Sequence, residues 1–474
     1  MYFEENVFGD LSLTSQLKLE VFFWTIQNYG LSVNSPRETA INLLYKIENA
    51  EGYSNIEIDK EFSKSDLSDL DKGLASELVY GVLTWKITLD EIIKRYSSIK
   101  IKKISDWILN ILRIGIYQIV FLDRIPVSAA VNESVKLAKK YGHEASSRFT
   151  NAILRKIEKN EFEKLMDYLA TKDLTESEII SIATSHPLWL VNKLLNQFDK
   201  KFVTELLSAN NEKTQITIRA NTLKTSRDDL LKLLKLKGYE CTEGNLQDSI
   251  FVNKLNDFTD SLYVAQDEAA QMSVLKLAPK PGEKILDACS APGGKTTYIA
   301  ALMNNQGLVD AWDIHEHRVK LVEQNAKKLG INIIKVEVKD ATEFSSGLLE
   351  YYDRILLDVP CTGIGVIRKK PDIKWSRHEE DIADLSNIQA QILSNCSKYL
   401  KKGGKLVYST CTIFDEENSI QIQNFLKAHS DFKLIEEIKL YPNINKTDGF
   451  YIAVLERNWG KFLGTFREEC DILW

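Results

Sequence analysis

The chain has 474 residues, of which 44% are hydrophobic and 27% are charged, a balance typical of a folded globular protein with about three domains. Its 61 Lys and Arg residues against 67 Asp and Glu residues give a net charge of -6, which excludes a protein that coats nucleic acid through bulk positive charge. No apolar run reaches the roughly 18 residues of a membrane span, and no signal peptide is recognisable. We therefore expect a cytoplasmic protein without membrane contact.

Six cysteines are present and none belongs to a CxxC pair, so no metal site is expected. In the cytosol they are free thiols, and each is by default a small buried hydrophobic residue. The two ends of the chain show no clear pattern. Residues 1–34 are interpreted as an N-terminal extension with a short apolar helix, and residues 458–474 as a C-terminal tail.

Residues 35–160 show only helical periodicity, which predicts an all-α bundle. Gly115 is expected at a close contact between helices, and Pro126 is expected to separate two of them. The apolar stripes lie at residues 40–47, 74–83, 104–112, 131–137 and 149–157.

Charge is distributed unevenly over this bundle. Residues 37–91 contain 6 basic and 12 acidic residues, whereas residues 92–160 contain 14 basic and 5 acidic ones. The basic excess is either an ordinary solvated helix surface or a face that binds RNA phosphates. The residues of this candidate face are Lys94, Arg95, Lys100, Lys102, Lys103, Lys136, Lys139, Lys140, Arg148, Arg155 and Lys156.

Residues 161–275 are predicted to form a small α+β connector, and residues 276–457 a doubly wound, Rossmann-like α/β domain with a mostly parallel sheet. In the connector, helices are expected near 188–208 and at 226–237, and strands at 215–220, 239–242 and 249–252. In the α/β domain, strands are expected at 284–288, 308–313, 333–338, 353–358, 405–410 and 449–455.

A glycine-rich turn follows the strand that ends at Asp287, and it opens a helix. Such turns present backbone N–H groups to a polar or anionic ligand. A P-loop needs Gly where this chain has Cys289, and the GxGxxG pattern is missing, so ATP and NAD are not favoured. The candidate ligands of a nucleoside-containing cofactor are Cys289, Ser290, Ala291, Pro292, Gly293, Gly294 and Lys295.

Acidic residues follow the next two strands. Asp313 ends the second strand about 20 residues after the glycine loop, where an acid binds ribose hydroxyls in nucleotide-binding folds. Arg318 lies one turn into the following helix. Asp340 follows the third strand and is either a contact for the base of the ligand or an ordinary turn residue.

Two cysteines follow the fourth and fifth strands. Asp358 and Cys361 lie at the end of the fourth strand, and Cys411 follows the fifth. Ligands bind at the carboxyl ends of strands in open α/β sheets. Two thiols there, beside a cofactor loop, favour a chemical role over a purely structural one. The basic stretch 368–370 either holds a phosphate or is an ordinary surface loop.

Together these motifs resemble a known family. Asp-x-Cys-x-Ala-Pro-Gly-Gly-Lys-Thr at 287–296, Asp-x-Pro-Cys at 358–361 and Ser-Thr-Cys at 409–411 are similar to the motifs of S-adenosylmethionine-dependent RNA cytosine-C5 methyltransferases of the Nol1/Nop2/Sun family. The stretches 266–268 and 447–450 resemble that family's flanking signatures. Residues 35–160 are similar to the NusB-type RNA-binding domain, and the combination resembles bacterial 16S rRNA methyltransferases.

The resemblance implies methylation of C5 of a specific cytosine in 16S rRNA through a covalent adduct at C6. Cys411 would be the nucleophile, Cys361 would assist breakdown of the adduct, and Asp358 would stabilise it at the N3 edge of the base. The family chemistry also explains the use of thiols, because a cysteine is nucleophilic even when only a few per cent is ionised.

The resemblance also implies S-adenosylmethionine as the cofactor. Residues 289–295 would wrap its methionine and ribose, Asp313 would bind the ribose and Asp340 the adenine. Arg318 and Asp358 join this cofactor site, and Lys295 faces either the cofactor or the substrate.

Several alternatives stay open from the sequence. In DNA cytosine methyltransferases the Pro-Cys thiol attacks, which would make Cys361 the nucleophile. The pocket of a tRNA methyltransferase would look much the same, and an RNA-binding factor with an inert catalytic domain is a further reading. A Rossmann dehydrogenase is disfavoured by the missing GxGxxG pattern. The oligomeric state stays open, with a monomer as the expectation.

Overall fold

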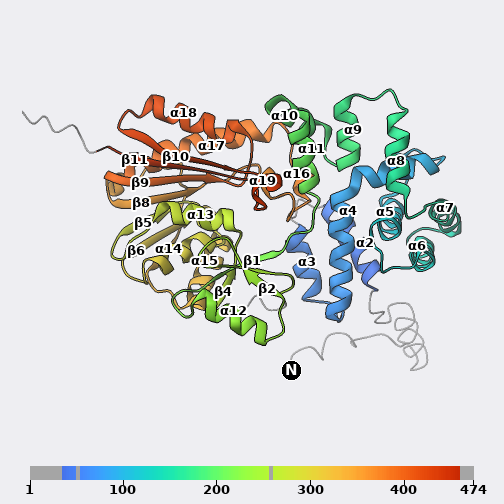
Figure 1. Cartoon of the computed structure of the whole chain (residues 1–474), viewed down its shortest axis with the longest axis horizontal. Helices are drawn as coiled ribbons and strands as arrows, with labels where there is room; N and C mark the ends of the chain where they lie inside the picture. Colours follow the sequence, from blue (N-terminus) through green and yellow to red (C-terminus); the bar gives the residue numbers. More distant parts are fainter. Residues whose placement is uncertain (1–34, 50–53, 256–259, 459–474) are drawn as a thin grey trace, which may run out of the picture. The chain divides into compact units, whose positions relative to one another are not determined.

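The computed structural model describes residues 35–49, 54–255 and 260–458, and the chain divides into two compact units, Met1–Asp173 and Leu174–Trp474 (Figure 1). The expected extension at 1–34 and residues 459–474 of the expected tail lie outside the described residues. Within the described part of the chain, no helix is both long enough and apolar enough to cross a membrane.

The first unit is built from α-helices, as the periodicity predicts. Every residue of α5 from Ile108 to Ile119 is buried, and this helix packs against α2, α4, α6 and α7. Burying one large aliphatic side chain stabilises the fold by about 1.5–3 kcal/mol, so α5 supplies much of this core. The helices are α2 Pro36–Asn49, α3 Ser54–Phe62, α4 Asp69–Tyr96, α5 Asp106–Phe121, α6 Val127–Tyr141, α7 Glu144–Leu154 and α8 Glu161–Ala170.

The two local expectations for this unit are confirmed. A Cβ added to Gly115 would lie 2.7 Å from a methyl carbon of Leu154 on α7 and 3.0 Å from Oγ of Ser134 on α6, so the glycine permits close packing. Pro126 directly precedes α6. Because proline has no backbone N–H to donate, one continuous helix cannot run from α5 through Pro126 into α6.

The second unit begins with three helices and a small antiparallel sheet of order β2-β3-β1-β4. The helix expected near 188–208 is two helices, because Asp199 accepts a hydrogen bond from the Phe202 N–H at 2.9 Å and caps the second one. The short strand β4 was not expected. The elements are α9 Glu176–Thr184, α10 Leu188–Gln197, α11 Lys200–Ala209, β1 Ile216–Ala220, α12 Arg227–Leu236, β2 Cys241–Glu243, β3 Ser249–Val252 and β4 Tyr263–Ala265.

A seven-stranded sheet of order β10-β11-β9-β8-β5-β6-β7 forms the rest of this unit. Five neighbouring strands are parallel, in the order β7-β6-β5-β8-β9, and β11 and β10 are added antiparallel beside β9. The predicted Rossmann-like domain is therefore confirmed. The strands are β5 Lys284–Asp287, β6 Leu308–Asp313, β7 Ile334–Val338, β8 Tyr352–Asp358, β9 Leu400–Thr410, β10 Phe432–Leu440 and β11 Phe450–Arg457. The helices are α13 Glu268–Leu277, α14 Gly294–Leu302, α15 Glu316–Leu329, α16 Ile373–Ser376, α17 Asp381–Cys396, α18 Ser419–Ala428 and α19 Pro442–Asn445.

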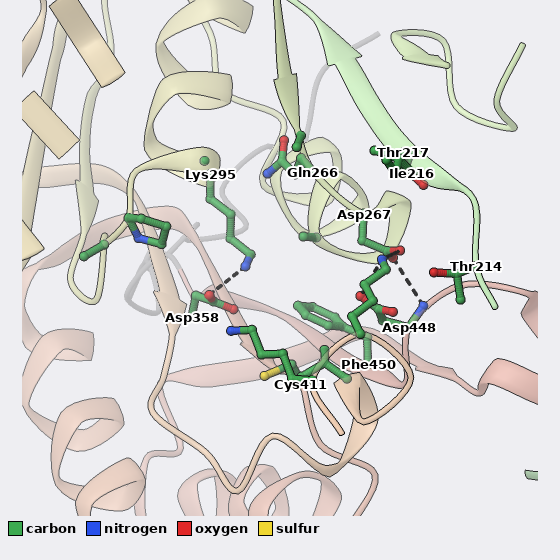
Figure 2. A pocket seen from close by; sticks show the side chains of 18 of the residues that line it. Thr214, Ile216, Thr217, Gln266, Asp267, Lys295, Asp358, Cys411, Asp448 and Phe450 are labelled. Atoms are coloured by element: carbon green, nitrogen blue, oxygen red, sulfur yellow. Dashed lines mark hydrogen bonds and ion pairs between the residues drawn. The ribbon is translucent and has the colours of Figure 1, made fainter. Parts of the chain in front are cut away.

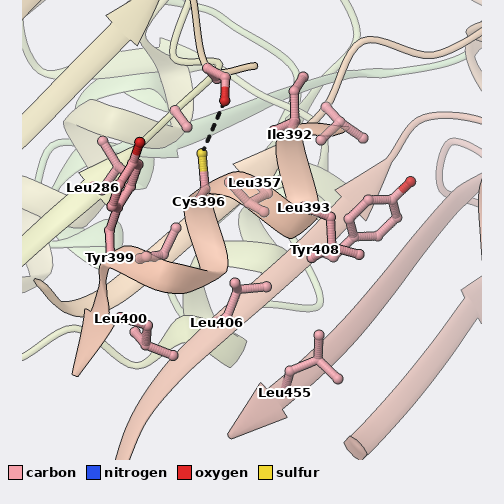
Figure 3. Close-up of a cluster of buried hydrophobic side chains, with 14 of the residues drawn as sticks. Leu286, Leu357, Ile392, Leu393, Cys396, Tyr399, Leu400, Leu406, Tyr408 and Leu455 are labelled. Atoms are coloured by element: carbon pink, nitrogen blue, oxygen red, sulfur yellow. Dashed lines mark hydrogen bonds between the residues drawn. The ribbon is translucent and has the colours of Figure 1, made fainter. Parts of the chain in front are cut away.

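Helices cover both faces of this sheet, and the strands alternate accordingly. Leu286 and Leu357 belong to the core shared with α17 and α18, whereas Ile285 and Leu356 belong to the core shared with α13, α14 and α15 (Figures 1 and 3). Cys396 lies in the first core, where its thiol contacts a backbone carbonyl at 3.7 Å (Figure 3). This cysteine is therefore a structural residue, as most cysteines are by default.

Candidate functional site

A cavity of about 520 Å³ lies at the carboxyl ends of the central strands, between the large sheet and the edge of the small sheet (Figure 2). This edge is where open α/β sheets bind their ligands. The cavity is lined by Thr214, Gln215, Ile216, Thr217, Ala265, Gln266, Asp267, Ala270, Asp287, Cys289, Ser290, Ala291, Pro292, Gly294, Lys295, Asp358, Val366, Lys369, Lys370, Cys411, Asp448 and Phe450.

The glycine-rich turn forms one wall of the cavity. Gly293 has φ +101°, and a Cβ there would lie 3.1 Å from the Val322 backbone, so both conformation and space require glycine. Ser290 donates to the Trp312 carbonyl through its N–H at 2.8 Å and its hydroxyl at 2.9 Å. These bonds fasten the turn to β6 and hold the start of α14 at the cavity.

Asp287 is a buried acid at the base of this turn. One carboxyl oxygen accepts the Thr296 hydroxyl at 2.7 Å, and the other has no hydrogen-bond partner among the described residues. Burial raises the pKa of Asp287 to about 7. The carboxyl group is thus an acceptor with spare capacity at the wall of the cavity.

The acids after the next two strands lie outside this wall. Asp313 accepts the His315 N–H at 3.1 Å and forms an ion pair with Arg318 at 3.4 Å. Arg318 also donates to the Ala291 carbonyl at 3.1 Å, so it connects Asp313 to the glycine turn. Asp340 lies two residues beyond β7 and accepts the Thr342 N–H at 2.8 Å. Asp313, Arg318 and Asp340, all within the described residues, do not line the cavity.

A partly buried ion pair at the wall of the cavity joins the start of α14 to the end of β8. Lys295 contacts Asp358 at 2.6 Å, and Ser409 donates to the other carboxyl oxygen at 2.9 Å (Figure 2). Burial alone would lower the pKa of Lys295, but the Asp358 carboxylate raises it above its ordinary value. Lys295 is therefore positively charged, and its contact with Asp358 is a charge-assisted hydrogen bond.

The two cysteines that follow β8 and β9 meet at this site, with Cys361 Sγ and Cys411 Sγ only 3.3 Å apart. The Cys361 thiol lowers the pKa of Cys411 by hydrogen bonding, and Lys295 and Lys370 act in the same direction against burial. The same hydrogen bond, together with burial, raises the pKa of Cys361. The thiolate is the reactive form of a cysteine, so this difference bears on which of the two thiols reacts.

The basic stretch 368–370 has divided roles. Arg368 donates to the Thr447 carbonyl at 3.0 Å, and Lys369 contacts both Asp267 and Asp448, the latter at 2.9 Å. Those two cations thus join segments of the fold. Lys370 is exposed, lines the cavity and forms no ion pair within the described residues.

Comparison with known proteins places these features in a family. The family model for the 16S rRNA methyltransferase RsmB/F matches residues 274–456, the NusB family model matches 34–159, and the RsmF/B-like ferredoxin-like domain model matches 186–259. A probable ribosomal RNA small subunit methyltransferase B of Bacillus subtilis is 36% identical over 89% of this chain and 99% of its own length. The corresponding protein of Photorhabdus laumondii is 36% identical over 83% and 92%.

The chain belongs to the RsmB/F family of rRNA methyltransferases. Solved structures agree with this assignment. The crystal structure of PH0851 superposes with a TM-score of 0.75 at 26% identity, covering 89% of this chain and 99% of that one. A methyltransferase homologue from Pyrococcus horikoshii superposes at 0.54 with 27% identity, covering 60% and 100%.

In this RsmB/F-family chain, residues of the two flanking signatures both line the cavity and hold its surroundings together. Asp267 caps α13 by accepting the Ala269 N–H at 2.9 Å, and buried Glu268 accepts the Ser249 hydroxyl at 2.5 Å. Gly449 packs on Gly365, where a Cβ on either residue would meet the other's backbone at under 3 Å. Since Gly365 N–H also donates to the Cys411 carbonyl at 2.9 Å, this contact joins the two cysteine loops.

Sequence reasoning missed two polar residues of this RsmB/F-family site, Asp287 and Glu417. Asp287 lies in a motif that was recognised, but nothing local shows that one of its oxygens has no hydrogen-bond partner among the described residues. Glu417 is buried behind the cysteines, and no local signal marks it.

The candidate RNA-binding face of the first unit proves to be partly neutralised. Lys94, Lys136 and Lys140 form ion pairs with nearby glutamates, and Arg95 with the fully buried Glu161. Within the described residues, no ion pair is formed by Lys100, Lys102, Lys103, Arg148, Arg155 or Lys156, all of which are exposed.

Proposed function

We propose that the chain transfers a methyl group from S-adenosylmethionine to C5 of a cytosine in 16S rRNA. The observation that carries this proposal is the pair of thiols 3.3 Å apart, beside the Lys295–Asp358 ion pair and the glycine-rich turn. A 16S rRNA substrate also implies a cytoplasmic enzyme.

The cavity suits the methyl donor. Backbone N–H groups at the start of α14 suit a carboxylate, and the unpartnered oxygen of Asp287 suits the ammonium group of the same amino acid. Asp313 would bind the ribose and Asp340 the adenine, since Asp313 ends β6, which neighbours β5, and Asp340 follows β7, the next strand in the sheet. S-adenosylmethionine supplies an electrophilic methyl group on its sulfonium.

Cys411 would perform the first chemical step, because C5 of cytosine is a poor nucleophile by itself. Attack of its thiolate on C6 forms an S–C6 bond, and the electrons of the C5=C6 bond make C5 enamine-like, so that C5 accepts the methyl group. Removal of the C5 proton then re-forms the double bond, and the S–C6 bond breaks to release Cys411 as thiolate.

Asp358 and Cys361 would assist these steps. Asp358 would hydrogen-bond the N3 edge of the base, and its anchoring by Lys295 and Ser409 supports that role. Cys361 would assist breakdown of the adduct, supported by its contact with Cys411. The target base has to be single-stranded or flipped out to reach these groups.

We also propose the division of labour along the chain. Residues 35–160 and the connector at 161–275 would hold the RNA, and residues 276–457 would carry out the methylation. The NusB and ferredoxin-like matches in the first two segments support this division.

The direct test is incubation of the protein with naked small-subunit rRNA and tritiated S-adenosylmethionine, followed by mapping of 5-methylcytosine. One modified cytosine in that RNA is expected. Incorporation into tRNA instead would overturn the substrate assignment but keep the mechanism. Absence of 5-methylcytosine from every RNA offered, with the folded protein still binding S-adenosylmethionine, would contradict the proposed activity.

The roles of the cysteines have their own test. Cys411→Ala is expected to abolish methylation, because no thiolate can attack C6. Cys361→Ala is expected to accumulate a protein–RNA adduct that survives denaturing electrophoresis. An adduct that forms with Cys411→Ala instead would reverse the two assignments.

A further inference from the structure

A buried carboxylate, Glu417, lies directly behind the two cysteines. Its side chain is fully buried and accepts hydrogen bonds from Thr362 N at 2.9 Å, Thr362 Oγ1 at 2.6 Å and Gln389 Nε2 at 3.0 Å. No lysine or arginine of the described chain forms an ion pair with it. Burial raises the pKa of Glu417 above its ordinary value, and the hydrogen bonds from Thr362, Gln389 and Thr412 act against this shift and favour the carboxylate.

The same carboxylate connects the turns that carry the two thiols. Thr362 directly follows Cys361, and Thr412 directly follows Cys411. Their hydroxyl oxygens lie 2.8 Å apart, and Glu417 accepts the Thr362 hydroxyl. Gln389 extends the network by donating to the Pro360 carbonyl at 2.9 Å. The separation of the two sulfur atoms is therefore set through one buried network.

Charges are distributed unequally around the cysteine pair. Glu417 is hydrogen-bonded directly to the turn of Cys361, through the N–H and the hydroxyl of Thr362. Lys295 and Lys370 line the cavity together with Cys411, whereas Cys361 is not among the described residues that line it. Asp358 opposes the ionisation of both thiols. A negative charge beside a thiol disfavours its ionisation, and a positive charge favours it.

We propose that Glu417 is a positioning residue that keeps the shared proton of the cysteine pair on Cys361, so that Cys411 carries the thiolate. When the pair ionises, the proton of Cys411 leaves to solvent. The remaining proton stays on Cys361, between its own sulfur and that of Cys411. This inference rests on the proposed function, because it explains which of the two cysteines would attack the base.

The test measures thiol reactivity in the absence of RNA and methyl donor, so it is independent of methylation. Iodoacetamide labelling at pH 6–10 is followed by peptide mass spectrometry, which separates Cys411 from Cys361. In the wild-type protein, Cys411 is expected to react at least about tenfold faster than Cys361 at neutral pH, since each pKa unit changes the thiolate fraction about tenfold. Equal or reversed labelling would overturn the proposal.

Glu417→Gln removes the charge and keeps the shape of the side chain. We expect the preference for Cys411 to fall at least about fivefold, and its labelling midpoint to move to higher pH. Glu416→Gln is the matched control, because Glu416 forms a surface ion pair with Lys193 at 2.5 Å and is expected to leave the preference unchanged. A folded Glu417→Gln protein with the wild-type preference would contradict the proposal.

Glu417→Asp keeps the negative charge but shortens the side chain, so it separates the effect of charge from the effect of shape. Circular dichroism first establishes that each variant is folded. Retention of the Cys411 preference in Glu417→Asp is expected, and its loss to the level of Glu417→Gln would show that charge is not the cause. If Glu417→Gln does not fold, equal labelling of the two cysteines in the wild-type protein, or loss of the Cys411 preference in a folded Glu417→Asp protein, would still contradict the proposal.

Discussion

At the scale of single residues, the site depends on neighbours that change the protonation of a few buried groups. Cys411 lines the cavity together with Lys295 and Lys370, whereas the residue after Cys361 is hydrogen-bonded to Glu417. Two cysteines of the same chemistry are thereby made different by their surroundings. Asp287 likewise differs from an ordinary aspartate mainly through burial, to which the nearby Asp358 carboxylate adds.

Asp287 makes stability depend on pH in a direction that can be predicted. Its pKa is about 7 in the folded protein, against about 4 for an aspartate in the unfolded chain. Between these values the folded state keeps a proton that the unfolded state has lost, so stability falls as pH rises from about 4 to about 7. Asp287→Asn cannot ionise and escapes this loss.

As pH increases from 5 to 7, the free energy of unfolding of Asp287→Asn is expected to rise relative to that of the wild type by roughly 1 kcal/mol per pH unit. Between pH 7 and 8 the difference is expected to level off. The thermal midpoint of the variant should rise relative to wild type in the same way. Differential scanning fluorimetry across this range measures the difference. Other titrating groups, such as Asp448, are common to both proteins and cancel. A difference that does not vary with pH would contradict the assignment.

At the scale of elements, local pattern and packing sometimes disagree. The strand β10 was not expected, because its central residues are exposed and mostly charged. It is an edge strand that pairs only with β11, so an alternating buried face is not required. In helix α4, by contrast, the close packing of Gly81 against Tyr117 outweighs the low helix propensity of glycine.

Two glycines of α4 form a matched pair for a stability test. A Cβ on Gly81 would lie 2.0 Å from the Tyr117 ring, which is held in place by a 2.8 Å hydrogen bond to Glu77. A Cβ on Gly73 would meet nothing within 4 Å. Gly81→Ala is expected to destabilise the first unit by about 1–3 kcal/mol despite the better helix propensity of alanine.

Gly73→Ala is the control and is expected to stabilise the protein by up to about 1 kcal/mol. Thermal unfolding followed by circular dichroism compares the two variants in the full chain. Similar midpoints for both variants would show that Tyr117 moves aside at little cost.

At the scale of the whole molecule, the chain combines a helical unit with a unit that contains the cavity. Each unit has its own core, and the candidate RNA-binding face, with its exposed basic residues that form no ion pair among the described residues, belongs to the first. If that surface holds RNA phosphates, its loss is expected to weaken RNA binding without affecting the cavity of the second unit.

The triple variant Arg148→Ala, Arg155→Ala and Lys156→Ala tests this separation. Binding of RNA is expected to weaken about tenfold in moderate salt, and the slope of log K against log salt to become shallower by about 2. Binding of S-adenosylmethionine, measured by calorimetry, is expected to be unchanged. The control is Lys94→Ala with Lys136→Ala, because both lysines are paired with glutamates at 2.7 Å. Equal losses in both variants would refute a specific face.

The sequence by itself determined the fold classes of the helical and Rossmann-like regions, the strand that ends at Asp287, the glycine turn and the two cysteine loops. These features are local: a strand followed by a turn at Gly293 is specified by neighbouring residues and by a backbone conformation that favours glycine. Periodicity likewise determined the helical bundle, since it reports which face of a helix is buried.

Only the tertiary structure decided which side chains meet. Cys361 and Cys411 are 50 residues apart in the chain yet in contact at 3.3 Å, because β8 and β9 are parallel neighbours in the sheet. The tertiary structure alone likewise joins Glu417 to the turn of Cys361. It also shows that Lys369 forms ion pairs, whereas Lys370 forms none among the described residues. Contacts of this kind depend on the packing of distant elements, which no local pattern encodes.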